Sequence, residues 1–433
     1  MVLTIYDLLL SLLYFFIIHF AAGYIQNKNI HKNGLYKWYR RGLLVKVAGG
    51  VGVCLVYQFY YTGGDTVNYY LSAKALSNMI FKDPGVFFDI LSGHNTIENW
   101  ASFDSTTGLP MYWGDKAAFF VSRFFVPIAF VSFQSFVVMT MLLSWLCYTG
   151  IWRLFLLFNE HFPNLEKQFA IAFLFIPSVV FWGSGLLKDS ITLSAVGWYT
   201  YHFYHFFIKK NYTFKRACFI LISSYLLVSI KPYIFFALLP GSLIWLSNER
   251  LATIRSSIIR VIVAPIFLLL GVGGGFFLLS QMTDVLGIYS LDKVMERAVI
   301  VNIDQKQEYY GGNSFDIGEF NADPLSMLSK AHLAIIATLF RPFLWDVRNF
   351  VMLMSALENT YILFLTLFLI IKLKIVNFFI LITKNPLLLF SVLFSLFFAF
   401  SVGIATSNFG SLVRLKIPCI PFYVSSLFVL KEY

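Results

Sequence analysis

The chain is too apolar for an ordinary water-soluble protein. Hydrophobic residues make up 58% of its 433 residues, charged residues make up only 13%, and the mean hydropathy is +0.73. A soluble domain carries about 25% charged residues, so this composition excludes a typical soluble enzyme. The net charge of +11 does not indicate nucleic-acid binding, because excess Lys and Arg in a membrane protein usually mark its cytoplasmic loops.

The cysteines indicate neither disulfides nor a metal site. All of them fall inside apolar runs, and they are Cys54, Cys147, Cys218 and Cys419. Cysteines in such runs usually behave as small buried hydrophobic residues. We therefore expect no structural metal and no cofactor.

Apolar segments long enough to cross a bilayer recur along the chain. About 20 residues are needed, because a helix rises ~1.5 Å per residue through a ~30 Å hydrocarbon core. No basic segment precedes the first of them, so we interpret it as a span rather than a signal peptide. We expect eleven spans within one integral membrane domain, 1–433, at about 4–24, 42–61, 132–157, 168–184, 187–208, 217–232, 233–248, 257–281, 347–371, 385–406 and 412–430.

The basic loops predict the orientation of these spans. Lys and Arg exceed acidic residues in four short loops, 25–41, 209–216, 249–260 and 372–384. With eleven spans and an outer N-terminus, all four loops lie in the cytoplasm, as the positive-inside rule requires. The C-terminus is then cytoplasmic. The two long polar loops, 62–116 and 282–332, are both net acidic and lie outside.

Two shorter apolar segments, 117–131 and 330–346, are expected to be interfacial helices at the outer face. Arg123 stands in the middle of the first, and counting either segment as a span would move the later basic loops outside. The predicted fold class is therefore an all-α polytopic membrane protein whose outer loops, 62–131 and 282–346, contribute to a functional site.

Ionisable residues at the outer ends of the spans are the candidates for function, because a charge near hydrocarbon is costly. The positive-inside rule does not require cations there, so we expect an anionic ligand. Arg offers a planar fork to phosphate oxygens and Lys a point charge. The predicted diphosphate-binding residues are Lys188, Lys231, Arg341, Arg414 and Lys416.

Asp65 is the predicted catalytic base. It follows two glycines, which allow a sharp turn at the membrane surface. A sugar hydroxyl that attacks an anomeric carbon needs a carboxylate within reach of its proton, and the departing diphosphate needs cations. Tyr69, Tyr70 and Trp345 are predicted to contact sugar rings.

Simpler structural roles remain open for each candidate. Asp65 is also a good helix cap. Lys188 and Asp189 could form a local ion pair or a helix cap, and Arg341 and Arg348 could pair with Asp346 or anchor anionic lipid. The acidic residues of 282–332 match no calcium-binding motif, so a solvated surface is the simplest interpretation.

These residues form an ordered series along the chain. The series consists of Gly63-Gly64-Asp65 with Tyr69-Tyr70, Pro177-Ser178 with Phe181-Trp182-Gly183-Ser184 and Lys188-Asp189, Lys231-Pro232-Tyr233, Arg341-Pro342-Phe343-Leu344-Trp345, and Asn408-Phe409-Gly410 with Arg414, Lys416 and Pro418. It resembles EpsG-type and related O-antigen (Wzy-like) polysaccharide polymerases over about 65–420. The beginning is also similar to the first outer loop of GT-C glycosyltransferases, in which an early Asp is the catalytic base. Lys188-Asp189 stands where the EpsG pattern has Arg-Gln.

The resemblance implies glycosyl transfer or chain polymerisation on polyprenyl-diphosphate-linked saccharides outside the cytoplasm of a bacterium, in its inner membrane. The expected partners are this lipid-linked glycan, the bilayer and other polysaccharide-assembly proteins. A transporter or flippase of the same glycans is the first alternative, but the sequence lacks the internal repeat typical of that class. A non-catalytic assembly subunit is the second alternative. A membrane O-acyltransferase is less favoured, since no His lies deep in a span.

Overall fold

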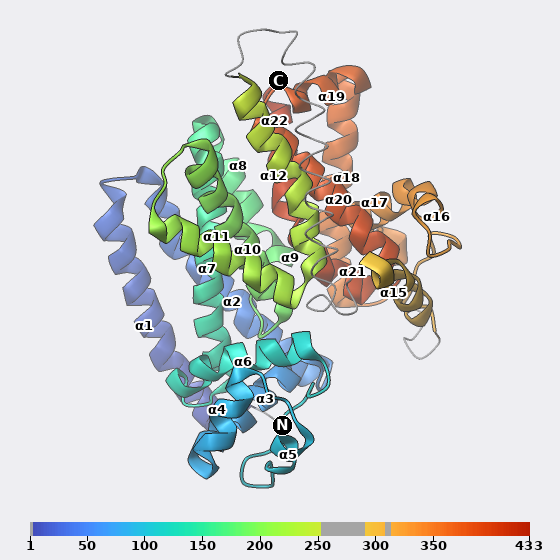
Figure 1. The fold of residues 1–433 in the computed structure, drawn as a ribbon. Helices are drawn as coiled ribbons and strands as arrows, with labels where there is room; N and C mark the ends of the chain where they lie inside the picture. Colours follow the sequence, from blue (N-terminus) through green and yellow to red (C-terminus); the bar gives the residue numbers. More distant parts are fainter. Residues whose placement is uncertain (1–2, 253–290, 308–312) are drawn as a thin grey trace.

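The computed structural model describes residues 3–252, 291–307 and 313–433, and these form an array of helices (Figure 1). The first half contains α1 (Ile5–Ile30), η1 (Gly34–Trp38), α2 (Tyr39–Leu55), η2 (Val56–Tyr60), α3 (Asp65–Lys82), α4 (Pro84–Ser92), α5 (Ile97–Ala101), α6 (Lys116–Val131), α7 (Phe136–His161), η3 (Pro163–Leu165), α8 (Glu166–Ala170), η4 (Ile171–Phe175), α9 (Pro177–Trp182) and α10 (Lys188–Phe203). The second half contains η5 (Tyr204–Ile208), α11 (Phe214–Ile230), α12 (Pro232–Ala252), α15 (Leu291–Asp304), α16 (Pro324–Ser329), α17 (Ala331–Phe340), η8 (Leu344–Asp346), α18 (Phe350–Leu373), α19 (Ile375–Thr383), α20 (Pro386–Ala405), α21 (Phe409–Leu415) and α22 (Ile420–Lys431).

The all-helical fold expected from the sequence is confirmed within the described residues, and several of these helices are long and apolar enough to cross a membrane. Within the described ranges there are five, or six if α21 and α22, bent by 67° relative to each other, form one broken span. The five are Ile5–Ile30, Gly34–Tyr60, Phe136–His161, Phe350–Leu373 and Pro386–Ala405.

The remaining expected spans have a different local structure. The predicted span 168–184 is divided into α8, η4 and α9, because Pro177 lacks the backbone N–H that would continue the helix. The predicted spans 187–208 and 217–232 correspond mainly to α10 and α11, which are 16 and 17 residues long. The predicted span 257–281 lies outside the described residues. The eleven-span topology therefore stays a prediction.

Small residues allow the central helices to pack closely. α7 packs against α1, α2 and α10, while α20 packs against α12, α17 and α22. A Cβ atom at Gly150 of α7 would lie 2.1 Å from the backbone oxygen of Ser194 on α10, and one at Gly403 of α20 would lie 2.2 Å from that of Ala334 on α17. Close backbone approach through small residues is typical of helices packed in membranes. The segment expected to be interfacial at 330–346 thus begins with a helix packed against α20.

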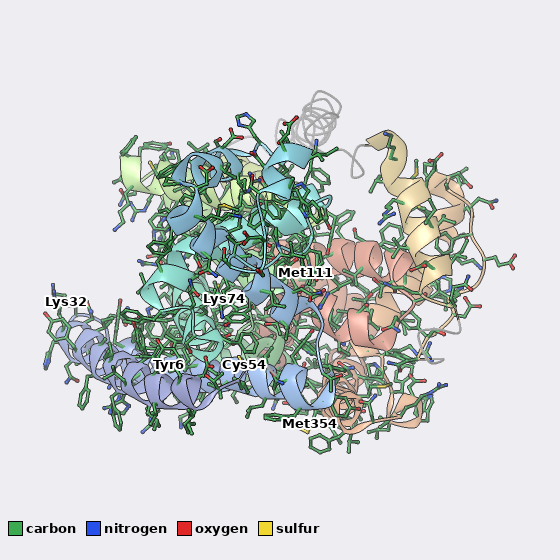
Figure 2. The ribbon with its side chains drawn as sticks, turned by 90° about the horizontal axis from the view of Figure 1, so that it is seen from below. Tyr6, Lys32, Cys54, Lys74, Met111 and Met354 are labelled. Atoms are coloured by element: carbon green, nitrogen blue, oxygen red, sulfur yellow. The ribbon has the colours of Figure 1, made fainter. Side chains whose placement is uncertain are left out.

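Helix α1 lies at the edge of the molecule, with Tyr6 and Lys32 near its two ends (Figure 2). Most of its apolar side chains are exposed, as expected for contact with lipid. Its buried Asp7 is an exception. Asp7 Oδ1 accepts hydrogen bonds from Ser135 Oγ at 2.6 Å and from the backbone N–H of Phe136 at 3.0 Å, at the beginning of α7.

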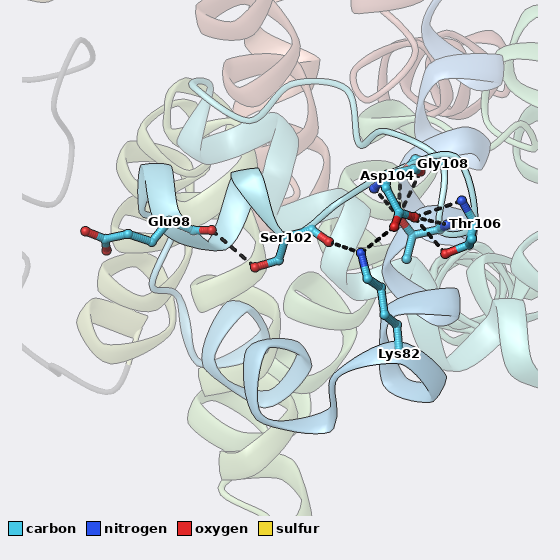
Figure 3. Close-up of polar contacts among 7 residues, drawn as sticks. Lys82, Glu98, Ser102, Asp104, Thr106 and Gly108 are labelled. Atoms are coloured by element: carbon cyan, nitrogen blue, oxygen red, sulfur yellow. Dashed lines mark hydrogen bonds and ion pairs between the residues drawn. The ribbon is translucent and has the colours of Figure 1, made fainter.

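Helices α3 to α6 form a layer at the end of the bundle opposite the C-terminus (Figure 1). The other segment expected to be interfacial, 117–131, corresponds to α6, which packs along α3. The loop between α5 and α6 is attached to the end of α3. Lys82 Nζ donates to Asp104 Oδ2 at 2.7 Å and to the carbonyl of Ser102 at 2.6 Å, while Asp104 Oδ1 accepts from the N–H of Thr106 at 2.8 Å (Figure 3).

Candidate functional site

Two glycines place Asp65 at the beginning of α3. Gly63 and Gly64 have φ angles of 149° and 106°, in the region that favours glycine, so the chain can turn sharply after η2. Gly64 is the N-cap of α3, and no side chain caps the helix. The alternative that Asp65 serves as the cap is therefore wrong, and its carboxylate is directed to tertiary partners.

Arg414, at the end of α21, bridges two carboxylates that are far apart in the sequence. Its Nη1 donates to Asp65 Oδ2 at 2.6 Å, and its Nε lies 3.3 Å from Asp189 Oδ2. The side chain of Asp65 is 37% exposed, whereas that of Asp189 is only 2% exposed. The two carboxylates thus differ in access although they share one cation.

Lys231 neutralises the other oxygen of Asp189. It lies in the turn between α11 and α12, and its ammonium forms a buried ion pair with Asp189 Oδ1. Asp189 is therefore held between Arg414 and Lys231, and a carboxylate in a position with so little solvent requires such pairing. Its adjacent residue, Lys188, pairs instead with Asp115 at 3.6 Å. The alternative of a local Lys188–Asp189 ion pair is wrong.

We call Asp65, Lys188, Asp189, Lys231 and Arg414 the Arg414 group. All five line one cavity of about 480 Å³. The other lining residues are Tyr69, Leu187, Ile230, Tyr233, Phe236, Val294, Met295, Arg297, Ala298, Val301, Gln305, Met327, Phe400, Ser401, Val402, Ile404, Ala405, Thr406 and Leu415. The polar groups of the cavity thus face an apolar wall formed mainly by α12, α15 and α20.

The surroundings of Asp65 keep its carboxylate ionised at neutral pH. Burial acts to raise the pKa of Asp65, but the charge of Arg414 and hydrogen bonds from Tyr112 and Arg414 outweigh it, so the pKa lies below its ordinary value. Tyr112 Oη donates to Asp65 Oδ1 at 2.7 Å.

The structure places Arg341 and Lys416 in a second polar assembly outside the cavity lining, which we call the Arg341 cluster. Arg341 forms a bidentate pair with Asp346, with Nε and Nη2 at 3.1 and 3.0 Å from its oxygens. Lys416 has no exposed surface and donates to Asn359 Oδ1 at 2.6 Å and to the carbonyl of Arg341 at 3.2 Å. Of the cations predicted to bind diphosphate, these two are not in the cavity.

The three aromatic residues predicted to contact sugar also separate. Tyr69 lines the cavity. Tyr70 points elsewhere, since its hydroxyl donates to the carbonyl of Gln134 and its ring packs against Phe136. Trp345 is 79% exposed and stacks on Phe343, away from the cavity lining.

Residues that the sequence analysis did not select complete the cavity and its surroundings. Arg297 of α15 belongs to the lining and has no ion-pair or hydrogen-bond partner among the described residues. The sequence feature that could have identified Arg297 is its place as a cation on an amphipathic segment within the acidic 282–332 region. Tyr112 and Asp115, from the loop before α6, contact Asp65 and Lys188. No sequence pattern marks either of them.

Comparisons with protein-family models, curated proteins and solved structures found no match to this chain.

Proposed function

We propose that the protein transfers or polymerises the saccharide of a polyprenyl-diphosphate-linked donor, with its reaction centre at the Arg414 group. The observation that carries this proposal is the convergence of Asp65, Lys188, Asp189, Lys231 and Arg414 from four distant segments on one cavity. Buried charges of both signs are costly, and their concentration in a cavity is typical of functional sites.

The charge of the lining favours an anionic ligand. Four cations, Lys188, Lys231, Arg297 and Arg414, face two carboxylates, so the lining carries a net charge of +2. A diphosphate diester brings about two negative charges and would balance this excess. Arg414 uses one Nη1–H for Asp65 and directs Nε toward Asp189, so further guanidinium donors remain for phosphate oxygens.

The apolar wall favours a lipid-linked ligand over a free sugar nucleotide. Side chains such as Phe236, Met295 and Phe400 line the same cavity as the charged residues. A ligand with an anionic head and a hydrocarbon chain matches both parts of the lining, because apolar surface gains free energy when it leaves water.

In the proposed reaction the acceptor hydroxyl attacks the anomeric carbon, and Asp65 receives the hydroxyl proton. The bond between the anomeric carbon and the diphosphate breaks, and the diphosphate leaves with the bonding electrons. Arg414, Lys188 and Lys231 stabilise the charge that develops on it. The phosphates compete with Asp65 for Arg414, so ligand binding makes the carboxylate more basic just where a base is required.

The positions of the other charges support an extracytoplasmic site within the eleven-span topology. α7 begins beside Asp7 and ends near Glu160, which pairs with Lys209 at 3.6 Å at the end of η5. At the C-terminal end, Lys372 Nζ donates to the carbonyl of Lys431 at 3.0 Å. These lysines lie at helix ends remote from the Arg414 group, as a cytoplasmic face requires under the positive-inside rule.

The test is complementation of a strain that lacks the gene with wild-type protein or Asp65→Asn at matched membrane levels. Surface polysaccharide is sized on a gel, and lipid-linked saccharides are extracted and measured. The proposal predicts loss of long chains with accumulation of lipid-linked repeats in the variant.

Normal polysaccharide with Asp65→Asn would contradict the proposed base. A loss of polysaccharide in which lipid-linked repeats accumulate only on the cytoplasmic side would instead indicate the transporter alternative. The variant replaces a carboxylate with an amide of the same shape, and a melting temperature close to that of the wild type shows that it folds.

A further inference from the structure

Tyr112 is, beside Arg414, the second polar partner of the Asp65 carboxylate. It has a φ angle of 63° in the loop that precedes α6. Its hydroxyl donates to Asp65 Oδ1 at 2.7 Å and lies 3.4 Å from Asn68 Nδ2, which donates to it. The hydroxyl therefore acts as donor and acceptor at once, so its proton is directed to Asp65.

The backbone and ring of Tyr112 are fixed independently of its hydroxyl. Met111 N–H donates to Ser72 Oγ at 2.9 Å, and the N–H of Asp115 donates to the Tyr112 carbonyl at 3.0 Å. The Tyr112 ring packs against Tyr69 with centroids 5.0 Å apart. Earlier in the loop, the Lys82–Asp104 pair attaches the chain to the end of α3 (Figure 3). Removal of the hydroxyl alone would therefore leave the loop in place.

The two oxygens of Asp65 have separate partners. Oδ2 receives Arg414 Nη1 at 2.6 Å, and Oδ1 receives Tyr112 Oη. These two interactions fix the rotation of the carboxylate. Oδ1 is paired with a neutral hydroxyl rather than with a guanidinium, so it is the more basic of the two positions.

We propose that Tyr112 is a positioning residue that orients Asp65 so that Oδ1, and not Oδ2, receives the acceptor proton. The inference rests on the proposed function and adds to it the residue that fixes the base. In the step concerned, the acceptor O–H bond breaks, its proton moves to Oδ1, and the acceptor oxygen bonds to the anomeric carbon as the diphosphate departs. The proton later leaves Asp65 to water.

The pH dependence of this step reflects every charged or titratable group that faces Asp65. They are Arg414 of α21, Lys188 of α10, Tyr57 of η2, Tyr69 of α3 and Tyr112 of the loop before α6, while Asp115 of that loop faces Lys188 and Tyr69. Burial and the Asp65 charge raise the pKa of Tyr112 well above its ordinary value, so its hydroxyl remains a donor at neutral pH. Its hydrogen bond helps to lower the pKa of Asp65, and loss of that bond must raise it.

The experiment measures initial rates of detergent-purified wild-type protein and Tyr112→Phe between pH 4.5 and 8. The substrate is the lipid extract of the strain that lacks the gene. We expect kcat to fall about tenfold, on the scale of one hydrogen bond to a charged group. The acidic limb of the profile moves to higher pH, while KM for the extract stays unchanged because the cavity cations are intact.

Two further variants separate positioning from a structural role. Asn68→Leu removes the donor to the Tyr112 hydroxyl and should move the acidic limb in the same direction by less. Asp115→Asn releases Lys188 and keeps an oxygen for the cap of α6, so it should change KM, and any shift of the acidic limb should be to lower pH, opposite to the shift in Tyr112→Phe. Tyr60→Phe, at an exposed tyrosine, is the matched control and should behave as wild type.

A Tyr112→Phe enzyme with wild-type kcat and pH profile, beside an inactive Asp65→Asn enzyme, would overturn this inference and leave the proposed function standing. An active Asp65→Asn enzyme would overturn the proposed function itself. A Tyr112→Phe enzyme that loses rate with an unmoved acidic limb would assign Tyr112 a structural role and also overturn the inference.

Discussion

Two assemblies of charged residues meet at the C-terminal end of the short helix α21, and they differ in how completely protein groups satisfy their charges. Arg414 belongs to the Arg414 group, in which Asp65 is 37% exposed and the cavity lining holds an excess of cations. Lys416, two residues later, belongs to the Arg341 cluster and has no exposed surface. Its ammonium is bound by Asn359 and by the Arg341 carbonyl.

The difference separates two uses of a charge near the membrane. In the Arg341 cluster, the Arg341 guanidinium is paired with Asp346 and lies against the rings of Phe315, Phe343 and Phe409 at 5.3, 5.6 and 5.3 Å. Such a cation fixes the positions of helices, and three aromatic rings lie against its guanidinium, whereas the guanidinium of Arg414 lines a cavity. The Arg414 group keeps donors and one carboxylate directed to a cavity. The same residue types thus form a structural joint in one place and line a cavity in the other, where we propose the binding site.

Removal of the shared cation should give the largest effect. Arg414→Gln takes away the group that bridges Asp65 and Asp189, so we expect turnover of the lipid extract to fall about 100-fold or more. Lys416→Met, compared at equal amounts of folded protein, should retain most of the activity. Equal losses in the two variants would remove the distinction between the two assemblies.

Ligand affinity should also distinguish the Arg414 group from the Arg341 cluster, with a smaller change than the change in turnover. Farnesyl diphosphate should stabilise the detergent-purified protein against heat, and the dependence of this stabilisation on ligand concentration gives an apparent affinity. In Lys188→Met this apparent affinity should fall about tenfold, because one cation of the cavity is lost. Farnesol and inorganic diphosphate, which carry only one part of the ligand each, should both bind more weakly than farnesyl diphosphate. An unchanged affinity in Lys188→Met, or equal binding of farnesol, would contradict the charge assignment.

For thermal stability, a change in the Arg341 cluster should have a clear effect although it leaves ligand affinity unchanged. Lys416→Met leaves the buried oxygen of Asn359 without its donor, which costs about 1–2 kcal/mol in free energy of unfolding. The expected result is a lower melting temperature with unchanged affinity for farnesyl diphosphate. Lys384→Met, at an exposed lysine, is the control and should melt as wild type does. A ligand-binding defect in Lys416→Met would place that lysine in the site after all.

The smallest effect concerns pH. The pKa of Asp65 lies below its ordinary value, so the Asp65–Arg414 pair contributes stability that is present above the unfolded-state pKa. That contribution is lost only as pH falls through the lower folded-state pKa. The wild-type melting temperature should therefore show no loss from this pair between pH 8 and 5.

In Arg414→Gln the burial of Asp65 is no longer opposed by the guanidinium, so the pKa of Asp65 rises. Protonation of Asp65 then removes an unpaired, partly buried charge in the variant, whereas Asp65 of the wild type stays ionised. The difference in melting temperature between wild type and Arg414→Gln should therefore shrink as pH falls. Melting curves at pH 8, 6.5 and 5 check this, and a difference that grows toward pH 5 would contradict the assigned sign.

The sequence was sufficient to predict the helical membrane fold and four members of the Arg414 group, because charges at the ends of apolar segments are visible as such. It was not sufficient to predict side-chain direction. Positions two apart on a helix point about 200° apart, so Arg414, in the last turn of α21, and Lys416, which follows this helix as its C-cap, cannot both face one cavity. Tyr112 was missed because its contact with Asp65 spans 47 positions and depends on a loop conformation that no periodic pattern encodes.

The buried Asp7 of α1 has a consequence for the order in which the chain assembles. Thr4 satisfies one oxygen of Asp7 within the same helical turn, through its backbone N–H at 3.0 Å and its hydroxyl at 2.7 Å. The partners of the other oxygen, Ser135 and Phe136, are synthesised 128 and 129 residues later. Since α1 is otherwise largely exposed and is long and apolar enough to cross a membrane, we expect it to enter the bilayer before its polar partner exists. The arrival of α7 then fixes how deeply the two helices sit relative to each other.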